Sequence, residues 1–336
     1  MAGSMKYEQI LGDLKNKIYY PVYFLTGEEP YYIDTISDYI EDHVLTDMEK
    51  EFNQNVVYGR DTDVLSIISM AKRYPMMANY QVVIVKEAQD VKDIEKLASY
   101  VESPLDSTLL VINYKYKKID GRKSFAQAVK KKGVFFESKK IYDNQLGSWI
   151  KNYLEKRGYS ITPKASAMLV EFLGTDLSKI VNELEKLTLN IPEKAEINDA
   201  IVEQNIGISK DFNTFELQNA IGSRNILKAN QIANYFAANP KDNPLVKTVS
   251  ILNGFFGKLL IYQQLPDKSR NNAASALSVN PFFVKDYQVA SRNYSKGKIA
   301  QIISLLREYD LKSKGVDNVS ATDGELLREM LFKILH

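Results

Sequence analysis

The stretch of sequence that decides the fold is Tyr23-Phe24-Leu25-Thr26-Gly27-Glu28-Glu29-Pro30-Tyr31-Tyr32-Ile33. Residues 21–25 form a short apolar run rich in branched and aromatic side chains, which predicts a buried strand that ends near Gly27. A helix is predicted from Tyr31 to about Val44, because apolar side chains recur there at helical spacing, at Ile33, Ile36, Ile40 and Val44. A strand, a glycine turn and a helix therefore stand where a phosphate-binding loop would lie.

This glycine turn lacks the residues that bind a nucleotide. A working phosphate-binding loop has two glycines around a nest of backbone N–H groups, a lysine for the phosphates, and a serine or threonine for magnesium. Here the second glycine and the lysine are absent, and the carboxylates of Glu28 and Glu29 would repel phosphate. We interpret Gly27, Glu28 and Glu29 as a degenerate phosphate loop, and we expect no cofactor.

Other catalytic chemistry is also missing from the sequence. The predicted strand at 81–85 continues into Lys86-Glu87 instead of an Asp-Glu pair that could hold magnesium and activate water. The chain has no cysteine and two histidines, His43 and His336, neither of which has a recognisable partner for a zinc site or a catalytic triad. We therefore expect no metal site, no catalytic residue, and a protein that is not an enzyme by itself.

Strand and helix signals alternate through the first 140 residues. Further strands are predicted at 81–85, 108–112 and 133–136, and further helices at 63–73 and 91–101. Four continuous apolar strands separated by helices indicate an α/β domain whose mainly parallel sheet is covered on both faces.

Helical periodicity replaces the strand signals from about Asp143. Thr162 is a predicted N-cap with Pro163 in the first helical position, and residues 177–187 carry an apolar stripe at Leu177, Ile180, Val181, Leu184 and Leu187. Later helices are predicted at 215–221, 225–236, 244–265, 272–277, 282–293, 298–314 and 324–335. Because 336 residues are too many for one core, we expect an α/β domain at 5–142, a small helical domain at 143–208 and a larger helical domain at 209–336.

Residues 1–4 resemble a cloning remnant, because Gly3-Ser4 precedes a second methionine. The longest apolar runs lie far below the roughly 20 residues that span a bilayer. We expect a cytoplasmic protein without a membrane partner.

Positive charge is concentrated in residues 113–132, although the net charge of the chain is only +2. Eight basic side chains face one acid there, and candidate DNA contacts are Lys115, Lys117, Lys118, Arg122 and Lys123. A solvated surface that contacts no partner is the alternative interpretation.

Short strings in all three predicted domains, in this order and spacing, resemble the delta subunits of bacterial DNA polymerase III clamp loaders. The glycine turn at 23–33 resembles the first motif of that family, in which a Gly-Glu pair replaces the phosphate loop. Gly174-Thr175-Asp176-Leu177 and Asn182-Glu183-Leu184-Glu185-Lys186-Leu187 are similar to its lid domain. Asn280-Pro281-Phe282-Phe283 and Tyr309-Asp310-Leu311-Lys312 are similar to its collar helices.

This resemblance implies an AAA+-like α/β domain without nucleotide hydrolysis, a helical lid and an all-α collar. It implies that the chain binds the sliding clamp (the beta subunit) and helps to open it for loading onto primed DNA. The partners would be the delta prime and tau/gamma subunits, contacted through the collar in a five-subunit complex. The complex serves a DNA polymerase III holoenzyme that carries nucleotidyltransferase activity.

The resemblance also implies a clamp-binding element, an exposed apolar pair just after the fourth helix and before a strand. Met76 and Met77 occupy that position, preceded by Tyr74 and Pro75. The family often has leucine and phenylalanine there, and methionine is flexible enough to fill irregular pockets. The alternative interpretation places both methionines in the core.

Two other functions compete with this interpretation. An ATP-binding AAA+ motor subunit of a clamp loader would need the missing phosphate-loop residues. A nucleic-acid-binding protein with a helical C-terminal domain would need an acidic metal cluster or a basic domain, and the sequence has one basic stretch.

Overall fold

The computed structural model describes residues 5–117, 119–206, 212–318 and 320–336. The chain forms two compact units, Met1–Ile141 and Tyr142–His336. The predicted boundary at residues 208 and 209 lies outside the described residues, as does the predicted remnant at residues 1–4. The three predicted domain ranges therefore stay predictions.

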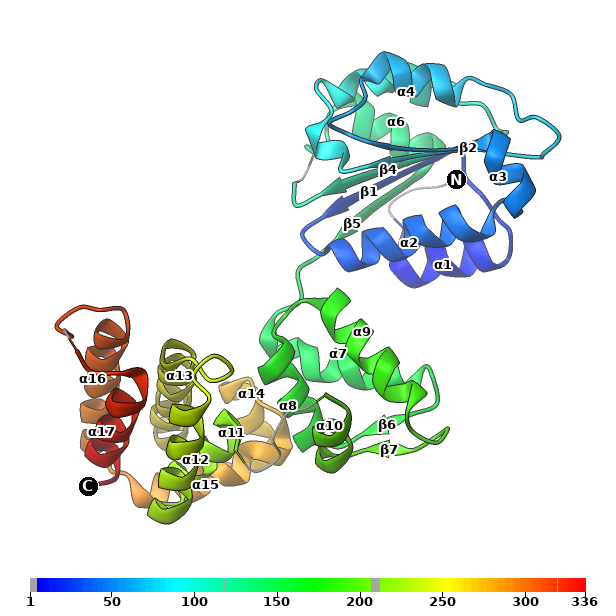
Figure 1. The fold of residues 1–336 in the computed structure, drawn as a ribbon. Coiled ribbons are helices and arrows are strands. Elements are labelled where there is room, and N and C mark those ends of the chain that lie inside the picture. Colours follow the sequence, from blue (N-terminus) through cyan, green and yellow to red (C-terminus); the bar gives the residue numbers. More distant parts are fainter. Residues whose placement is uncertain (1–4, 118, 207–211, 319) are drawn as a thin grey trace. The chain divides into compact units, whose positions relative to one another are not determined.

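Five parallel strands build the sheet of the first unit, in the order β2-β3-β4-β1-β5 (Figure 1). They are β1 (Val22–Gly27), β2 (Gln54–Tyr58), β3 (Gln81–Lys86), β4 (Thr108–Lys115) and β5 (Val134–Ser138). Because all five strands run in the same direction, their carboxyl ends share one edge of the sheet and their amino ends share the other.

Helices cover both faces of this sheet (Figure 1). On one face lie α1 (Tyr7–Lys15) and α2 (Pro30–His43), and on the other lie α4 (Val64–Ala71) and α6 (Ser124–Lys132). Alternate residues of β1 enter opposite cores, so Tyr23 packs among side chains of α1 and α2 while Phe24 packs among those of α4 and α6. The predicted parallel sheet with two covered faces is confirmed.

The remaining elements of this unit are short. They are α3 (Asp47–Asn53), η1 (Ala88–Asp90), η2 (Ile94–Leu97) and α5 (Ala98–Val101). The predicted helix at 91–101 is therefore wrong in extent, because Asp93 adopts a left-handed φ of 53° and the helical residues begin at Ile94.

The prediction of four strands is also wrong, because β2 is a fifth. This strand lies at the edge of the sheet, and its side chains are half-buried or exposed. An edge strand with one neighbour does not need the continuous apolar run that identified the buried strands. Its sequence, Gln54-Asn55-Val56-Val57-Tyr58, therefore gave a weak signal.

The second unit begins with helices that the sequence largely predicts. They are α7 (Asp143–Glu155), α8 (Pro163–Leu173), α9 (Leu177–Leu189) and α10 (Asp199–Ile206). The Thr162 hydroxyl accepts a hydrogen bond from the Ala165 N–H at 3.2 Å, which confirms the predicted N-cap. The expectation of no further strands is wrong, because β6 (Ser160–Ile161) pairs with β7 (Glu196–Ile197). Two-residue strands are too short to produce a periodic signal.

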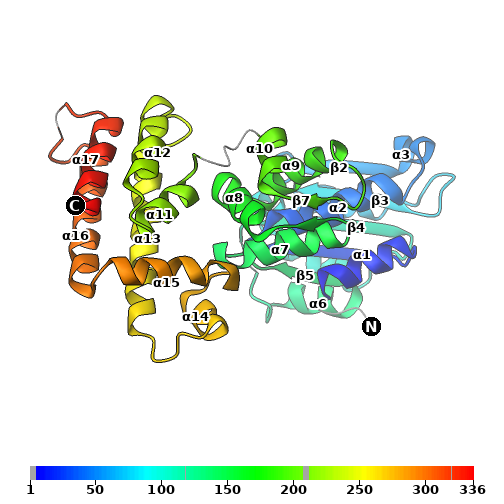
Figure 2. The same ribbon diagram turned by 90° about the horizontal axis from the view of Figure 1, so that it is seen from below.

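In the described residues from 212 onward, seven α-helices follow, and all lie within a few residues of their predicted ranges. They are α11 (Thr214–Gly222), α12 (Ile226–Ala238), α13 (Leu245–Gln264), α14 (Arg270–Leu277), α15 (Val284–Asn293), α16 (Lys296–Ser313) and α17 (Asp323–Leu335), with the 3₁₀ turn η3 (Pro281–Phe283). The helix α13 packs against α16, and α12 packs against α17 (Figure 2).

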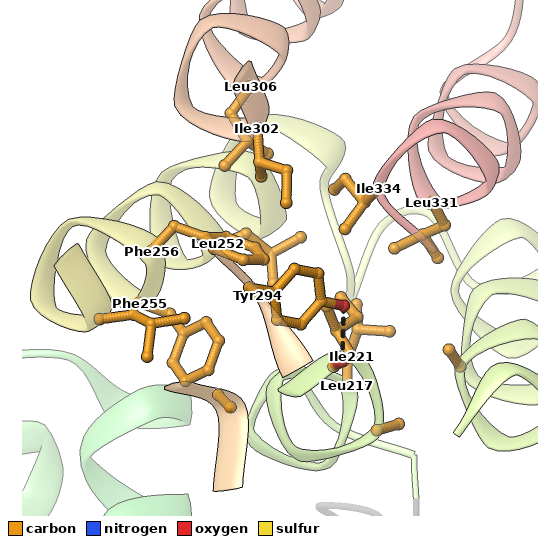
Figure 3. Close-up of a cluster of buried hydrophobic side chains, with 14 of the residues drawn as sticks. Leu217, Ile221, Leu252, Phe255, Phe256, Tyr294, Ile302, Leu306, Leu331 and Ile334 are labelled. Atoms are coloured by element: carbon orange, nitrogen blue, oxygen red, sulfur yellow. Dashed lines mark hydrogen bonds between the residues drawn. The ribbon is translucent and has the colours of Figure 1, made fainter. Parts of the chain in front are cut away.

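The core of these helices surrounds α13 (Figure 3). Tyr294 enters this core, its ring lies edge-on to Phe256, and its hydroxyl donates to the Ile221 carbonyl at 2.8 Å. Burial raises the pKa of Tyr294 to about 12. The hydroxyl is thus a neutral donor that joins the end of α15 to α11.

Length and composition would allow α13 to cross a membrane, but both are also typical of the core helix of a soluble protein. Leu252, Phe256 and Leu259 of this helix are fully buried among the neighbouring helices. We therefore interpret α13 as a core helix.

The stripe of α9 gives the first prediction, because all five of its predicted residues are buried. Replacing Leu184 with alanine should cost about 2–5 kcal/mol in the free energy of unfolding, through lost burial and a residual cavity. Urea denaturation measures the cost. Leu189→Ala on the same helix is the matched control, because that side chain is 86% exposed and should change stability by less than about 0.5 kcal/mol. Equal denaturation midpoints for the two variants would contradict the assignment.

Candidate functional site

The two edges of the parallel sheet carry the candidate sites. Ligands of open α/β sheets bind at the carboxyl ends of the strands. Gly27 ends β1 at that edge, and Glu87 and Lys115 lie at the ends of β3 and β4 beside it. The loop with Met76 and Met77 precedes β3 and therefore lies at the opposite, amino edge.

At the carboxyl edge, the glycine turn uses its own N–H groups within the chain. The N–H of Glu28 donates to the Ser138 carbonyl at 3.3 Å, and the N–H of Glu29 donates to the Ser138 hydroxyl at 3.1 Å. The N–H of Tyr31 donates to the Glu29 carboxylate at 3.3 Å, and Pro30 has no N–H. The backbone nest that would hold phosphate is thus occupied by protein groups.

Glu29 supplies a carboxylate to this turn. Its side chain is buried and caps the N-terminus of α2, where the helix dipole favours a negative charge. Gly27 has a φ of 126°, and a Cβ there would lie 2.1 Å from the Ser138 carbonyl oxygen. Only glycine permits this close approach of β1 to β5.

Lys115 supplies a cation to the same edge. Its Nζ lies 2.8 Å from an Asp34 carboxylate oxygen and 3.0 Å from one of Glu87, and its side chain is only 13% exposed. Burial by itself lowers the pKa of Lys115, but hydrogen bonds with Asp34 and Glu87 outweigh burial and raise the pKa above its ordinary value. Burial would raise the pKa of Glu87, but hydrogen bonds from Gln89 and Lys115 lower it instead.

Several cationic side chains of the basic segment at 113–132 are already paired with acidic residues. Lys115 belongs to the half-buried network with Asp34 and Glu87, Arg122 pairs with Asp120 at 2.9 Å, and Lys123 pairs with Glu95 at 2.6 Å. Lys117 is exposed, with its Nζ 3.4 Å from the Gln89 carbonyl. Lys118 lies outside the described residues. The structure therefore removes Lys115 from the exposed surface and leaves Lys117, Arg122 and Lys123 on it.

The side chains of the candidate loop at the amino edge point into solvent. Met76 is 64% exposed, Met77 is fully exposed, Tyr74 is also exposed, and Pro75 is half-buried. The alternative interpretation that both methionines belong to the core is wrong. The loop lies beside α3 (Figures 1 and 2). Two apolar side chains of that helix, Met48 and Phe52, are also exposed.

Asn53 is a residue of this loop site that sequence reasoning missed. It ends α3, is fully buried, and forms two hydrogen bonds with the backbone of Met76. No local pattern indicates this contact, because the two residues are 23 positions apart.

For a metal ion, the described ranges contain no group of three His, Cys, Asp or Glu side chains in suitable positions. Two acidic residues at the carboxyl edge, Asp34 and Glu87, are paired with Lys115.

Two protein-family models match this chain, one in each of its two units. The family model of the DNA polymerase III delta subunit matches residues 23–139, and the model of the C-terminal domain of that subunit matches residues 211–332. The chain is therefore a subunit of the clamp-loader class, with a parallel-sheet α/β domain followed by helices. It belongs to the family of DNA polymerase III delta subunits.

Two relatives from Bacillus subtilis are similar over nearly the whole chain. The curated DNA polymerase III subunit delta of strain 168 is 28% identical over 329 residues, which cover 94% of this chain and 93% of that protein. The solved structure of the DNA clamp loader delta protein is 25% identical, with a TM-score of 0.57, and the match covers 98% of this chain and 99% of the other.

The network of Lys115 gives the second prediction. Lys115→Met should lower the free energy of unfolding by about 1–3 kcal/mol at neutral pH, because Asp34 and Glu87 lose their shared cation while staying partly solvated. Chemical denaturation at several pH values measures this difference.

The difference should shrink in acid, and the sign follows from the pKa of Glu87. Since folding lowers that pKa below its ordinary 4.5, the stabilisation is present above pH 4.5 and is lost as the pH falls through the folded value. Equal stability of the variant and the parent protein at pH 7 would contradict the role of Lys115.

Proposed function

We propose that the chain binds the ring-shaped sliding clamp and helps to open it for loading onto primed DNA during replication. It would act as a non-hydrolysing member of a five-subunit clamp loader whose other subunits hydrolyse ATP. Membership in the delta family supports the assignment to a clamp loader. The observation that carries the clamp-binding role is the exposed pair Met76 and Met77 on a loop held by Asn53.

The exposed methionine pair suits a protein interface. Tyr74, Met76 and Met77 place large apolar side chains in solvent within four residues. Such a group gains free energy when a partner pocket removes it from water, and a few central residues supply most of the affinity of an interface. The flexible thioether side chain of methionine adapts to an irregular pocket.

The carboxyl edge supports a role without nucleotide hydrolysis. The carboxylate of Glu29 caps α2, and Ser138 accepts hydrogen bonds from the N–H groups of Glu28 and Glu29. ATP would have to displace these bonds and bring its phosphates close to the Glu29 carboxylate. These features favour a pseudo-ATPase over the alternative of a motor subunit.

The remaining parts of the proposal concern the assembled complex. The C-terminal helices would contact the delta prime and tau/gamma subunits, and the protein would act in the cytoplasm. Lys117, Arg122 and Lys123 keep exposed cationic side chains that suit phosphate contacts with primed DNA in the complex. The pairing of Arg122 and Lys123 with acidic residues reduces the net charge that this surface offers.

The third prediction concerns nucleotide. Isothermal titration of the isolated chain with ATP and magnesium should give no binding heat, because the N–H groups of the glycine turn are already bonded. A nucleotide-binding clamp-loader subunit titrated in the same buffer is the control. Heat that corresponds to a dissociation constant of about 10 micromolar, or roughly 7 kcal/mol, would overturn the pseudo-ATPase proposal.

The fourth prediction concerns the clamp. The double substitution Met76→Ala and Met77→Ala should weaken binding to the purified sliding clamp by at least about 2 kcal/mol, or about 30-fold. Surface plasmon resonance measures the affinity. The thermal midpoint should change little, because both side chains are already exposed.

Leu189→Ala is the matched control for this experiment, because it removes an equally exposed apolar side chain from the second unit. It should leave the affinity for the clamp unchanged. If the methionine variant bound the clamp as tightly as the parent protein, the clamp-binding site would lie elsewhere in the chain.

A further inference from the structure

We propose that Asn53 is a positioning residue that sets the conformation in which Met76 and Met77 meet the clamp. This inference rests on the proposed clamp-binding function. It adds Asn53, a residue of α3. The hydrogen bonds of Asn53 reach the loop backbone and do not involve the exposed side chains of the loop.

Both ends of the Asn53 amide are engaged. Its Oδ1 accepts a hydrogen bond from the Met76 N–H at 2.6 Å. Its Nδ2 donates to the Met76 carbonyl at 2.9 Å and to the Glu49 carbonyl, within α3, at 3.0 Å. The same side chain therefore fixes Met76 and ties it to the last turn of α3.

The loop has few other attachments. Within the described ranges, the hydrogen bonds to residues 74–79 are the two that Asn53 makes with Met76. Pro75, directly before Met76, has no N–H to contribute. Ala78 also packs against the core, but the described hydrogen bonds that hold the loop tip come from Asn53, whose side chain is fully shielded from solvent.

The backbone after Met76 needs this support. Met77 has a φ of 54°, in the left-handed region, which costs a residue with a Cβ roughly 1 kcal/mol. Such a conformation persists only where surrounding contacts hold it. The bonds from Asn53 fix the residue before this turn, and the turn directs the fully exposed Met77 side chain away from the domain.

A held loop binds more tightly than a free one. Ordering a flexible segment on binding reduces the affinity, so a loop that is already in its bound conformation avoids that loss. Asparagine suits the task because its side chain carries one acceptor and one donor group in a single plane, which match the carbonyl and N–H of one residue. Aspartate retains the acceptor and lacks the donor.

The test begins with Asn53→Ala in the full-length chain and with the purified sliding clamp as the probe. The dissociation constant should rise about tenfold or more, although every exposed apolar side chain is still present. Asn53→Asp is the second variant, because it keeps the volume and the acceptor for the Met76 N–H while it removes the donor to the Met76 carbonyl. It should weaken binding in the same direction.

The effect of lower stability on clamp binding must be separated from the effect of a displaced loop. Val129→Ala removes buried groups from α6 in the same unit without touching the loop, so it should lower the thermal midpoint and leave the clamp affinity unchanged. Comparable weakening of clamp binding by Val129→Ala would show that destabilisation alone explains the Asn53 result, and it would overturn the inference.

A double-mutant cycle makes the decisive comparison. If Asn53 acts through the methionine pair, adding Asn53→Ala to the Met76→Ala and Met77→Ala variant should leave the clamp affinity unchanged while still lowering the thermal midpoint. An additive loss of affinity would overturn the inference, as would an unchanged affinity for Asn53→Ala alone. If the methionine variant itself bound normally, the proposed function would fail together with this inference.

Discussion

Parallel pairing of β1 with β4 and β5, and of β3 with β2 and β4, is the constraint on which the rest of the first unit depends. A parallel sheet needs helices on both faces to cover its strands. Only the two edges at the strand ends then remain for function. The chain uses them differently, with a network of paired charges at the carboxyl edge and an exposed apolar loop at the amino edge. A strand length of roughly 20 Å separates the two edges.

At the carboxyl edge, the protein supplies charges that a nucleotide-binding protein takes from its ligand. Glu29 places a carboxylate at the N-terminus of α2, where the helix dipole favours a negative charge. Lys115 places a cation between Asp34 and Glu87 at the strand ends, where a metal ion would balance the acids. Lys115, Asp34 and Glu87 therefore balance one another within the protein.

At the amino edge, the exposed apolar side chains contribute little to the stability of the folded chain. Buried apolar side chains stabilise the folded chain, whereas Met76 and Met77 lie in solvent and contribute little to it. Their backbone is nevertheless held by Asn53, and Met77 keeps a left-handed conformation. Exposed side chains on a held backbone are typical of an interface, because the side chains find their contacts in the partner.

The sequence by itself determined the features that depend on neighbouring residues. Periodicity identified β1, α2 and the buried stripe of α9, and residue identity showed that Gly27, Glu28 and Glu29 lack phosphate-binding chemistry. Only the tertiary structure decided which partners the polar side chains take. Lys115 meets Glu87 across 28 positions, and Asn53 meets Met76 across 23. The edge strand β2 was missed for the same reason, because its pairing with β3 identifies it as a strand and its own sequence lacks a continuous apolar run. Contacts between distant residues depend on how elements pack, and local composition does not encode them.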